Sequence, residues 1–176
     1  MNQIEKLIAE ISVARNSYLK AVSSFSEQQA QWKSSPEVWS VVEITEHLFW
    51  AEQGGTLGMW KTLNAIRDGK MPRKIESIHL NMPIEEIIAL TWQAKEQVPA
   101  VAAPRMGGPI AFWQASFSSL QNLIDLFSKE LTDIDLRTQA HPHPISGAMD
   151  FQQRLEFIRF HIDRHTGQVE GILSQL

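Results

Sequence analysis

Residues 150–173, which read DFQQRLEFIRFHIDRHTGQVEGIL, carry the periodicity that decides the fold. The apolar side chains recur every three or four residues, and on a helical wheel they fall within roughly 100° of arc. They are Phe151, Leu155, Ile158, Ile162, Val169, Ile172 and Leu173. Asp150 suits the N-cap, because a side-chain oxygen there accepts a hydrogen bond from the first helical turn. The stretch therefore predicts an amphipathic helix with one buried face.

Three further stretches show the same pattern, at residues 2–22, 40–66 and 109–131. In the second of these, Ser40 is followed three residues later by Glu43, which is the pairing of a capping box and predicts a helix start. The third begins at a proline, which is well tolerated in the first helical turn. Together with the last stretch they predict four long amphipathic helices.

A shorter, auxiliary helix is predicted over residues 84–97, between Pro83 and Pro99. Glycine, proline and charged residues predict loops at 69–82, 102–108 and 136–149. No segment alternates apolar and polar residues between hairpin turns, so no sheet is expected. The fold class predicted is all-α: a four-helix bundle with one short auxiliary helix. At 176 residues, the chain is expected to form one domain over residues 1–176.

Composition excludes several classes of function. The chain has no cysteine, which excludes disulfides, thiolate metal sites and a cysteine nucleophile. Its net charge is −4, and the basic residues are scattered among the acidic ones, so no nucleic-acid partner is expected. The N-terminus lacks the apolar core of a signal peptide, and there is no 18-residue apolar run. We expect a cytoplasmic protein that does not bind a membrane.

Two histidines of the last predicted helix lie one turn apart on the same face. His161 and His165 have the i, i+4 spacing that lets two imidazoles reach one ion. The helical wheel places His165 within the apolar stripe, His161 at its edge and Asp163 on the solvent side. Ile162 stands where the zincin motif H-E-x-x-H has glutamate, so that mechanism is excluded. The alternative interpretation is a pair of partly exposed histidines without a ligand.

His47 lies far from this pair in sequence, and its role is left open by geometry. It falls roughly 100° or more from the centre of the apolar stripe of its helix. Its neighbours on the wheel include Ala51, Gly54 and Gly58, which could leave room for a cavity or allow close helix packing. A third imidazole would complete a three-histidine site with open coordination positions. If His47 stood alone, a histidine at the boundary of the core would be the favoured interpretation.

The other histidines are predicted to lie away from such a site. His141 and His143 flank prolines in a loop and are expected at the surface, although that loop could lie over a site. His79 is expected in a charged loop without a role. Among the six tryptophans, Trp50 is a candidate for the wall of a ligand pocket, with core packing as the alternative.

Two segments resemble the histidine motifs of a known family. Residues 39–52, with His47 at their centre, are similar to the first motif of the DinB/YfiT-like superfamily. Residues 141–168, with His161, Arg164, His165 and Gln168, resemble its C-terminal motif.

The resemblance implies a four-helix bundle in which His47, His161 and His165 bind a divalent metal, with nickel or zinc first and iron or manganese as alternatives. Relatives include thiol S-transferases that use bacillithiol or mycothiol, a thiol-dependent isomerase and proteins assigned as metal-dependent hydrolases. Many members dimerise, so a homodimer is expected.

The first functional hypothesis is a metal-dependent enzyme acting on a small molecule. A divalent ion lowers the pKa of bound water or thiol, which suits either a hydrolase or a transferase. Since the chain lacks cysteine, the thiol would be a low-molecular-weight cofactor. Glu52 is the candidate proton acceptor, and Gln168 and Trp50 are candidate pocket residues. The alternative is a non-catalytic helical binding or dimeric module, related to stress, with a vestigial metal site whose cleft is closed by Trp50 or Phe160.

Overall fold

The computed structural model describes residues 1–75, 78–93 and 97–176. The long helices are α1 (Gln3–Val22), α3 (Val41–Arg67), α5 (Ile110–Ser128) and α7 (Phe151–Leu173). The short helices are α2 (Glu27–Gln31), α4 (Ile84–Thr91) and α6 (Asp133–Leu136). Within the described ranges there is no strand, only two isolated β-bridges. The prediction of an all-α helical bundle is confirmed.

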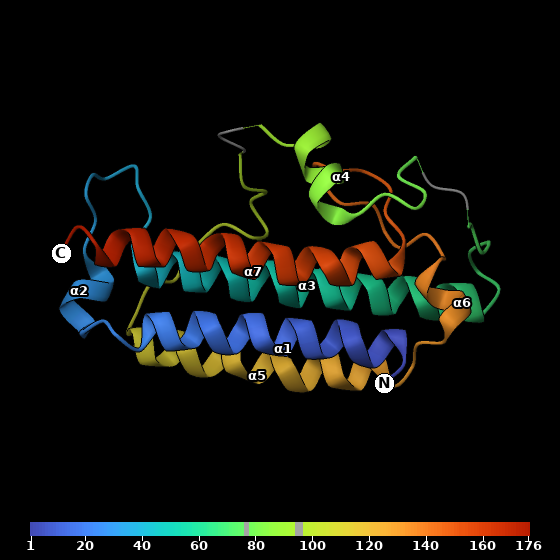
Figure 1. Cartoon of the computed structure of the whole chain (residues 1–176), viewed down its shortest axis with the longest axis horizontal. Helices are drawn as coiled ribbons and strands as arrows, with labels where there is room; N and C mark the ends of the chain where they lie inside the picture. The colour runs from blue at the N-terminus through green and yellow to red at the C-terminus, as the bar shows by residue number, and fades with distance from the viewer. Residues whose placement is uncertain (76–77, 94–96) are drawn as a thin grey trace.

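The four long helices pack as a square bundle. Helix α1 packs mainly on α7 and α3 mainly on α5, while contacts of α1 with α5 and of α3 with α7 close the square (Figure 1). Helices α1 and α7 run in one direction and α3 and α5 in the other (Figure 1). The connection between the parallel helices α3 and α5 must therefore return along the length of the bundle. This connection carries α4, which packs on α7.

Helix starts follow the capping signals of the sequence. The side chains of Ser40 and Asp150 accept hydrogen bonds from Glu43 N–H and Gln153 N–H, and both helices begin with a complete capping box. All four long helices contribute to the main core, whose fully buried residues include Ile11, Leu63, Phe117, Ile124 and Leu155. Among the described helices, none is both long and apolar enough to cross a membrane.

The auxiliary helix is shorter than the pattern predicts. Helix α4 ends at Thr91, because Trp92 adopts an extended conformation and its Nε1 donates to Ser146 Oγ. The tertiary contacts of this indole therefore compete with continuation of the helix. Residues 94–96 of the predicted helix, and 76–77 of the loop predicted before it, lie outside the described ranges. The sequence pattern also missed α2 and α6, which are too short to show helical periodicity.

Candidate metal centre

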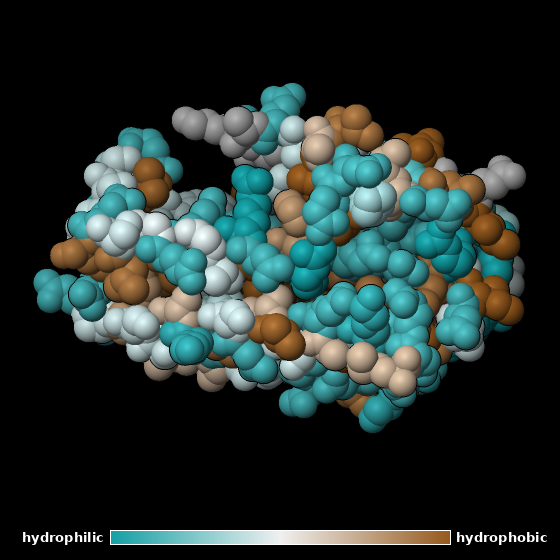
Figure 2. All heavy atoms as spheres, in the orientation of Figure 1, coloured by the Kyte–Doolittle hydropathy of each residue, from teal (hydrophilic) through white to brown (hydrophobic). Residues whose placement is uncertain are grey.

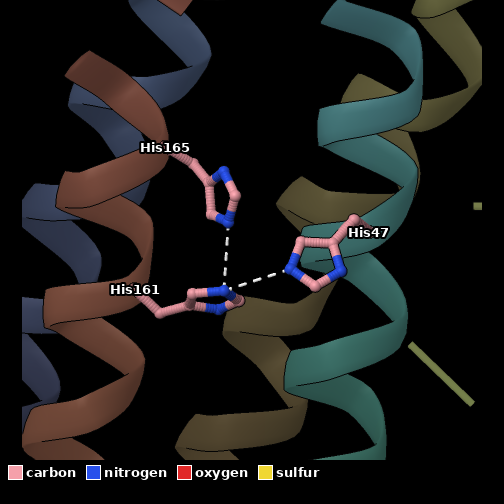
Figure 3. A group of neighbouring side chains, drawn as sticks. All are labelled: His47, His161 and His165. Carbon is pink, nitrogen blue, oxygen red and sulfur yellow. Dashed lines mark hydrogen bonds between the residues drawn. The ribbon is translucent and has the colours of Figure 1, made fainter. Parts of the chain in front are cut away.

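Three imidazoles from two helices converge between α3 and α7 (Figure 3). His161 Nε2 lies 3.1 Å from His47 Nε2 and 3.0 Å from His165 Nε2. All three side chains are buried, with exposed fractions of 5% for His47, 8% for His161 and 5% for His165. The inward orientation predicted for the pair on α7 is confirmed, and Asp163 faces solvent. The packing of α3 against α7 brings His47 to the same point.

Two of the imidazoles are oriented by hydrogen bonds at their other ring nitrogen. His47 Nδ1–H donates to the carbonyl of Ala102 over 2.8 Å. His165 Nδ1–H donates to Gln168 Oε1 over 2.7 Å. Because Nδ1 carries the proton in both His47 and His165, the Nε2 atom of each keeps its lone pair and points at His161. Histidine ligands of metal ions are oriented in the same way. Gln168, a predicted pocket residue, thus holds a candidate ligand in place.

The protonation state of the three histidines suits metal binding. Burial lowers the pKa of His47, and it lowers that of His165 to about 3. For His161, burial and the neighbouring imidazoles of His165 and His47 hold the pKa well below its usual range. All three are therefore neutral at pH 7, as ligation requires. Metal–nitrogen bonds of about 2.0–2.1 Å place two ligating nitrogens roughly 3.0–3.5 Å apart, and the distances from His161 Nε2 to the other two Nε2 atoms fit this range.

The loop behind His47 is anchored by Glu46, a residue that sequence reasoning missed. The carboxylate of Glu46 is fully buried and accepts hydrogen bonds from the backbone N–H groups of residues 105–107 and from Trp50 Nε1. Burial opposes ionisation of Glu46, but these hydrogen bonds together keep its pKa below the usual value. The anchor places the loop that carries the Ala102 carbonyl. The sequence held no signal for this role of Glu46, because the donors are backbone N–H groups of a loop far away in sequence.

The histidines face an open cavity of about 1490 Å³. It lies between α3 and α7 and is bounded by the loops around residues 33–39, 97–104 and 141–145. In Figure 2 its opening appears as a notch in the upper edge, between the first two of these loops. Ala51 and Gly54, which were expected to leave room for a cavity or close packing, line it. A small molecule can therefore reach the histidine cluster.

Trp50 is one wall of this cavity, as the pocket interpretation expected. Its indole lies beneath the guanidinium of Arg105, 4.0 Å from the ring centroid, and packs edge-on against Phe49 and Trp113. Phe160 instead packs with the small hydrophobic cluster around α4. Neither aromatic residue closes the cleft.

Glu52, the candidate proton acceptor, is engaged in a buried ion pair. Its Oε1 and Oε2 accept hydrogen bonds from Arg15 at 2.6 and 2.8 Å. Burial raises the pKa of Glu52, and the guanidinium of Arg15 opposes that rise. Because both carboxylate oxygens are occupied, the contacts describe a packing role, and a catalytic role for Glu52 stays a prediction.

The remaining histidines are less exposed than expected. His141 and His143 are partly buried and line the cavity, so the surface placement is wrong and the alternative, a loop lying over the site, holds. His143 stacks on Trp92 and packs against Phe157. His79 is buried and its Nε2 bonds the carbonyl of Ser146, outside the cavity lining. The contacts of His143 with Trp92, just after α4, and with Phe157 of α7 hold the loop of His141 and His143 against the bundle.

Comparison with known proteins agrees with this architecture. The family model of the DinB superfamily matches residues 10–169. The chain belongs to the DinB superfamily. Searches of curated proteins and of solved structures found no match. The resemblance carried by the two histidine motifs is thus confirmed for this DinB protein, and its three-histidine cluster fits a metal-binding site.

Proposed function

We propose that this DinB protein is a divalent-metal-dependent enzyme acting on a small molecule. The observation that carries the proposal is the convergence of the Nε2 atoms of three neutral imidazoles, two of them oriented by hydrogen bonds at Nδ1, at the wall of an open cavity. Three neutral ligands leave the ion its full charge, which lowers the pKa of a bound thiol or water. His47, His161 and His165 would hold the ion, with zinc or nickel as first candidates.

Transfer of a low-molecular-weight thiol to an electrophile is the reaction that the cavity favours. Among the described lining residues, the buried carboxylate Glu52 is bound by Arg15, and Glu43 is bound by Lys33 and its capping box. Glu37 is exposed. Hydrolysis of the thermolysin kind uses a carboxylate as general base beside the metal, whereas an activated thiolate attacks without one. Since the chain has no cysteine, the thiol must come from a second molecule.

Two other possibilities remain as competitors. Hydrolysis by water activated at the metal needs no protein carboxylate if the pKa of that water falls near 7. A non-catalytic module with a vestigial site is disfavoured by the open cavity, because that hypothesis expects a closed cleft. The expected homodimer is a separate proposal, which sedimentation of the metal-loaded protein tests.

Metal analysis tests the site directly. Protein purified without chelator or nickel resin should carry about one equivalent of a divalent metal per chain. His161→Ala and His165→Ala should lose it, because each removes a ligand, whereas His141→Gln in the same cavity should retain it. A metal content below about a tenth of an equivalent, and no uptake from added zinc or nickel, would contradict the proposal.

Turnover separates the three functions. Metal-loaded protein is assayed with a small thiol and chlorodinitrobenzene for transfer, and with nitrophenyl acetate for hydrolysis. Thiol transfer by the wild type, together with its loss in His161→Ala, supports the proposal. Hydrolysis alone favours the hydrolase, and metal binding without turnover over a broad panel favours the non-catalytic module.

A further inference from the structure

Arg154 of α7 is a buried cation that lacks a counter-ion. Its side chain is only 5% exposed and forms part of the cavity wall. Nη2 bonds the Nε2 atom of His141 over 3.1 Å, but Nε and Nη1 have no hydrogen-bond partner in the described structure. These two atoms carry three of the five N–H donors of a guanidinium. A buried charge with unused donors is costly, so its presence calls for a ligand.

Glycines on the facing helix α3 leave the space that Arg154 and its contact residue His141 occupy. A Cβ atom at Gly55 would lie 3.4 Å from Arg154 Nη2. A Cβ atom at Gly58 would lie 2.6 Å from the ring of His141, which is closer than packing allows. Both glycines therefore provide space on α3 for the arginine and for the imidazole that contacts it. The space left by these glycines accommodates the buried guanidinium, and no carboxylate among the described residues pairs with it.

The surroundings of Arg154 leave its charge unbalanced. Burial lowers its pKa to about 10, so it remains protonated at neutral pH. The described salt bridges include none to Arg154, while Glu52 and Glu43 of the cavity wall are neutralised by other cations. Arg164 is a second cation of the wall, lying 5.3 Å from the ring centroid of Trp92. The α7 side of the cavity is therefore positively charged.

We propose that Arg154 binds a carboxylate of the small molecule whose reacting group meets the histidine cluster. Arg154 and His161 are seven residues apart on α7, which is two turns and about 10.5 Å along the axis. The carboxylate enters from the cavity and takes the place of the His141 imidazole on the guanidinium. This inference rests on the proposed function for the reacting end of the ligand, but binding of the carboxylate needs only Arg154.

A carboxylate is favoured over a phosphate because of charge. Arg154 is the buried cation of this wall and balances one negative charge, whereas Arg164 is exposed to solvent. The second charge of a dianion bound at Arg154 in this partly apolar cavity would therefore stay uncompensated. The planar guanidinium also matches a carboxylate in a two-point hydrogen-bonded pair. The ring of Phe157, whose centroid lies 5.9 Å from the guanidinium carbon, provides an apolar surface for the carbon chain beside it.

Matched acids and alcohols test the proposal. Binding of mercaptohexanoate, mercaptooctanoate and the corresponding mercaptoalkanols is measured by calorimetry on zinc-loaded wild type, Arg154→Met, Arg154→Lys and Arg159→Met. Arg159 is the control, because it lies on the same helix but pairs with Glu85 and Asp163. Wild type and Arg159→Met should prefer the acid by about tenfold or more. Arg154→Met should lose this preference, and Arg154→Lys should keep part of it.

Metal-free protein separates this inference from the proposed function. Hexanoate should raise the melting temperature of metal-free wild type more than hexanol does, and this difference should vanish in Arg154→Met. Equal binding of acid and alcohol by wild type would overturn the inference, even if Arg154→Met fails to fold. Inorganic phosphate that stabilises the wild type as much as hexanoate would overturn the choice of a monoanion. If the wild type binds no metal but its metal-free form still prefers hexanoate to hexanol, only the proposed function would be overturned.

Discussion

Arg15 and Arg154 are both buried arginines of the same bundle, and they differ in their hydrogen-bond partners. Arg15 of α1 is 2% exposed and binds Glu52, Gln121 and the carbonyl of Phe117. Arg154 of α7 is 5% exposed, and within the described ranges its guanidinium has one hydrogen-bond partner, the imidazole of His141. The first guanidinium is satisfied by the protein itself. The second has donors left for a molecule that the protein binds.

This difference extends to the regions around the two arginines. Near Arg15 the polar groups pair with one another, as in the hydrogen bond of 2.8 Å between Tyr18 and Thr45. Near Arg154 the polar groups face a cavity, and the Nε2 atoms of the three histidines converge beside it. Substitutions in the first region should lower stability, and those in the second should change binding without lowering stability.

The largest expected effect is the loss of stability when Arg15 loses its carboxylate partner. Glu52→Ala leaves the charge of Arg15 buried without a partner, so the free energy of unfolding should fall by about 3–5 kcal/mol. Urea denaturation of metal-free protein measures this change. Glu85→Ala, which removes an exposed partner of Arg159, should cost less than about 1 kcal/mol.

The double variant Arg15→Met/Glu52→Leu sharpens the same point. It removes both charges, so much of the stability should return. If thiol transfer returns as well, Glu52 acts through packing. Restored stability and metal content without restored activity would instead support the predicted role of Glu52 as proton acceptor.

Gln168→Leu tests whether the open region serves binding. It removes the acceptor for His165 Nδ1–H, and loss of such an orienting partner lowers metal affinity by about 10–100-fold. Competition with a chromogenic chelator measures the affinity. Gln175→Leu is the control, because Gln175 also lines the cavity but donates to the Gly171 carbonyl. A large loss of stability in Gln168→Leu, with affinity unchanged, would argue against the division between the two regions.

Arg154→Met should raise stability, which is the opposite of the result at Arg15. Removing an uncompensated buried charge and filling its space with apolar atoms should increase the free energy of unfolding by about 1–2 kcal/mol. Urea denaturation without carboxylate ligands measures it. A decrease of similar size would show that Arg154 contributes to folding as Arg15 does.

Acid should weaken the open region because its histidines are buried neutral. Burial, with the charges of Arg154 and His141, lowers the pKa of His143 to about 3. In the unfolded chain the pKa is about 6.5, so protons bind the unfolded state first and stability falls as pH drops below about 6.5. His143→Gln should flatten this decline by up to about 1.4 kcal/mol per pH unit. Parallel stability curves for metal-free wild type and variant between about pH 7 and 5.5 would contradict it.

Much of this protein can be predicted from its sequence because the signals are local. Apolar periodicity placed the four long helices, and the capping residues Ser40 and Asp150 marked two helix starts. The i, i+4 spacing of His161 and His165 placed both imidazoles on one inward face. Arg154 lies on that face too, four residues before Ile158. The helical wheel could therefore have predicted that this arginine faces inward, but the inward face was assigned from apolar residues and histidines alone.

Tertiary structure alone decided which of these groups meet. The spacing within α3 could not bring His47 to α7, since its place depends on how two helices pack more than a hundred residues apart in sequence. The position of α1 in the bundle gave Glu52 its partner Arg15, whereas the packing around α7 left Arg154 without an acidic partner among the described residues. A sequence encodes the face on which a side chain lies, because helical geometry is local. Whether a buried charge finds a partner depends on the contacts between elements, which are formed only in the folded chain.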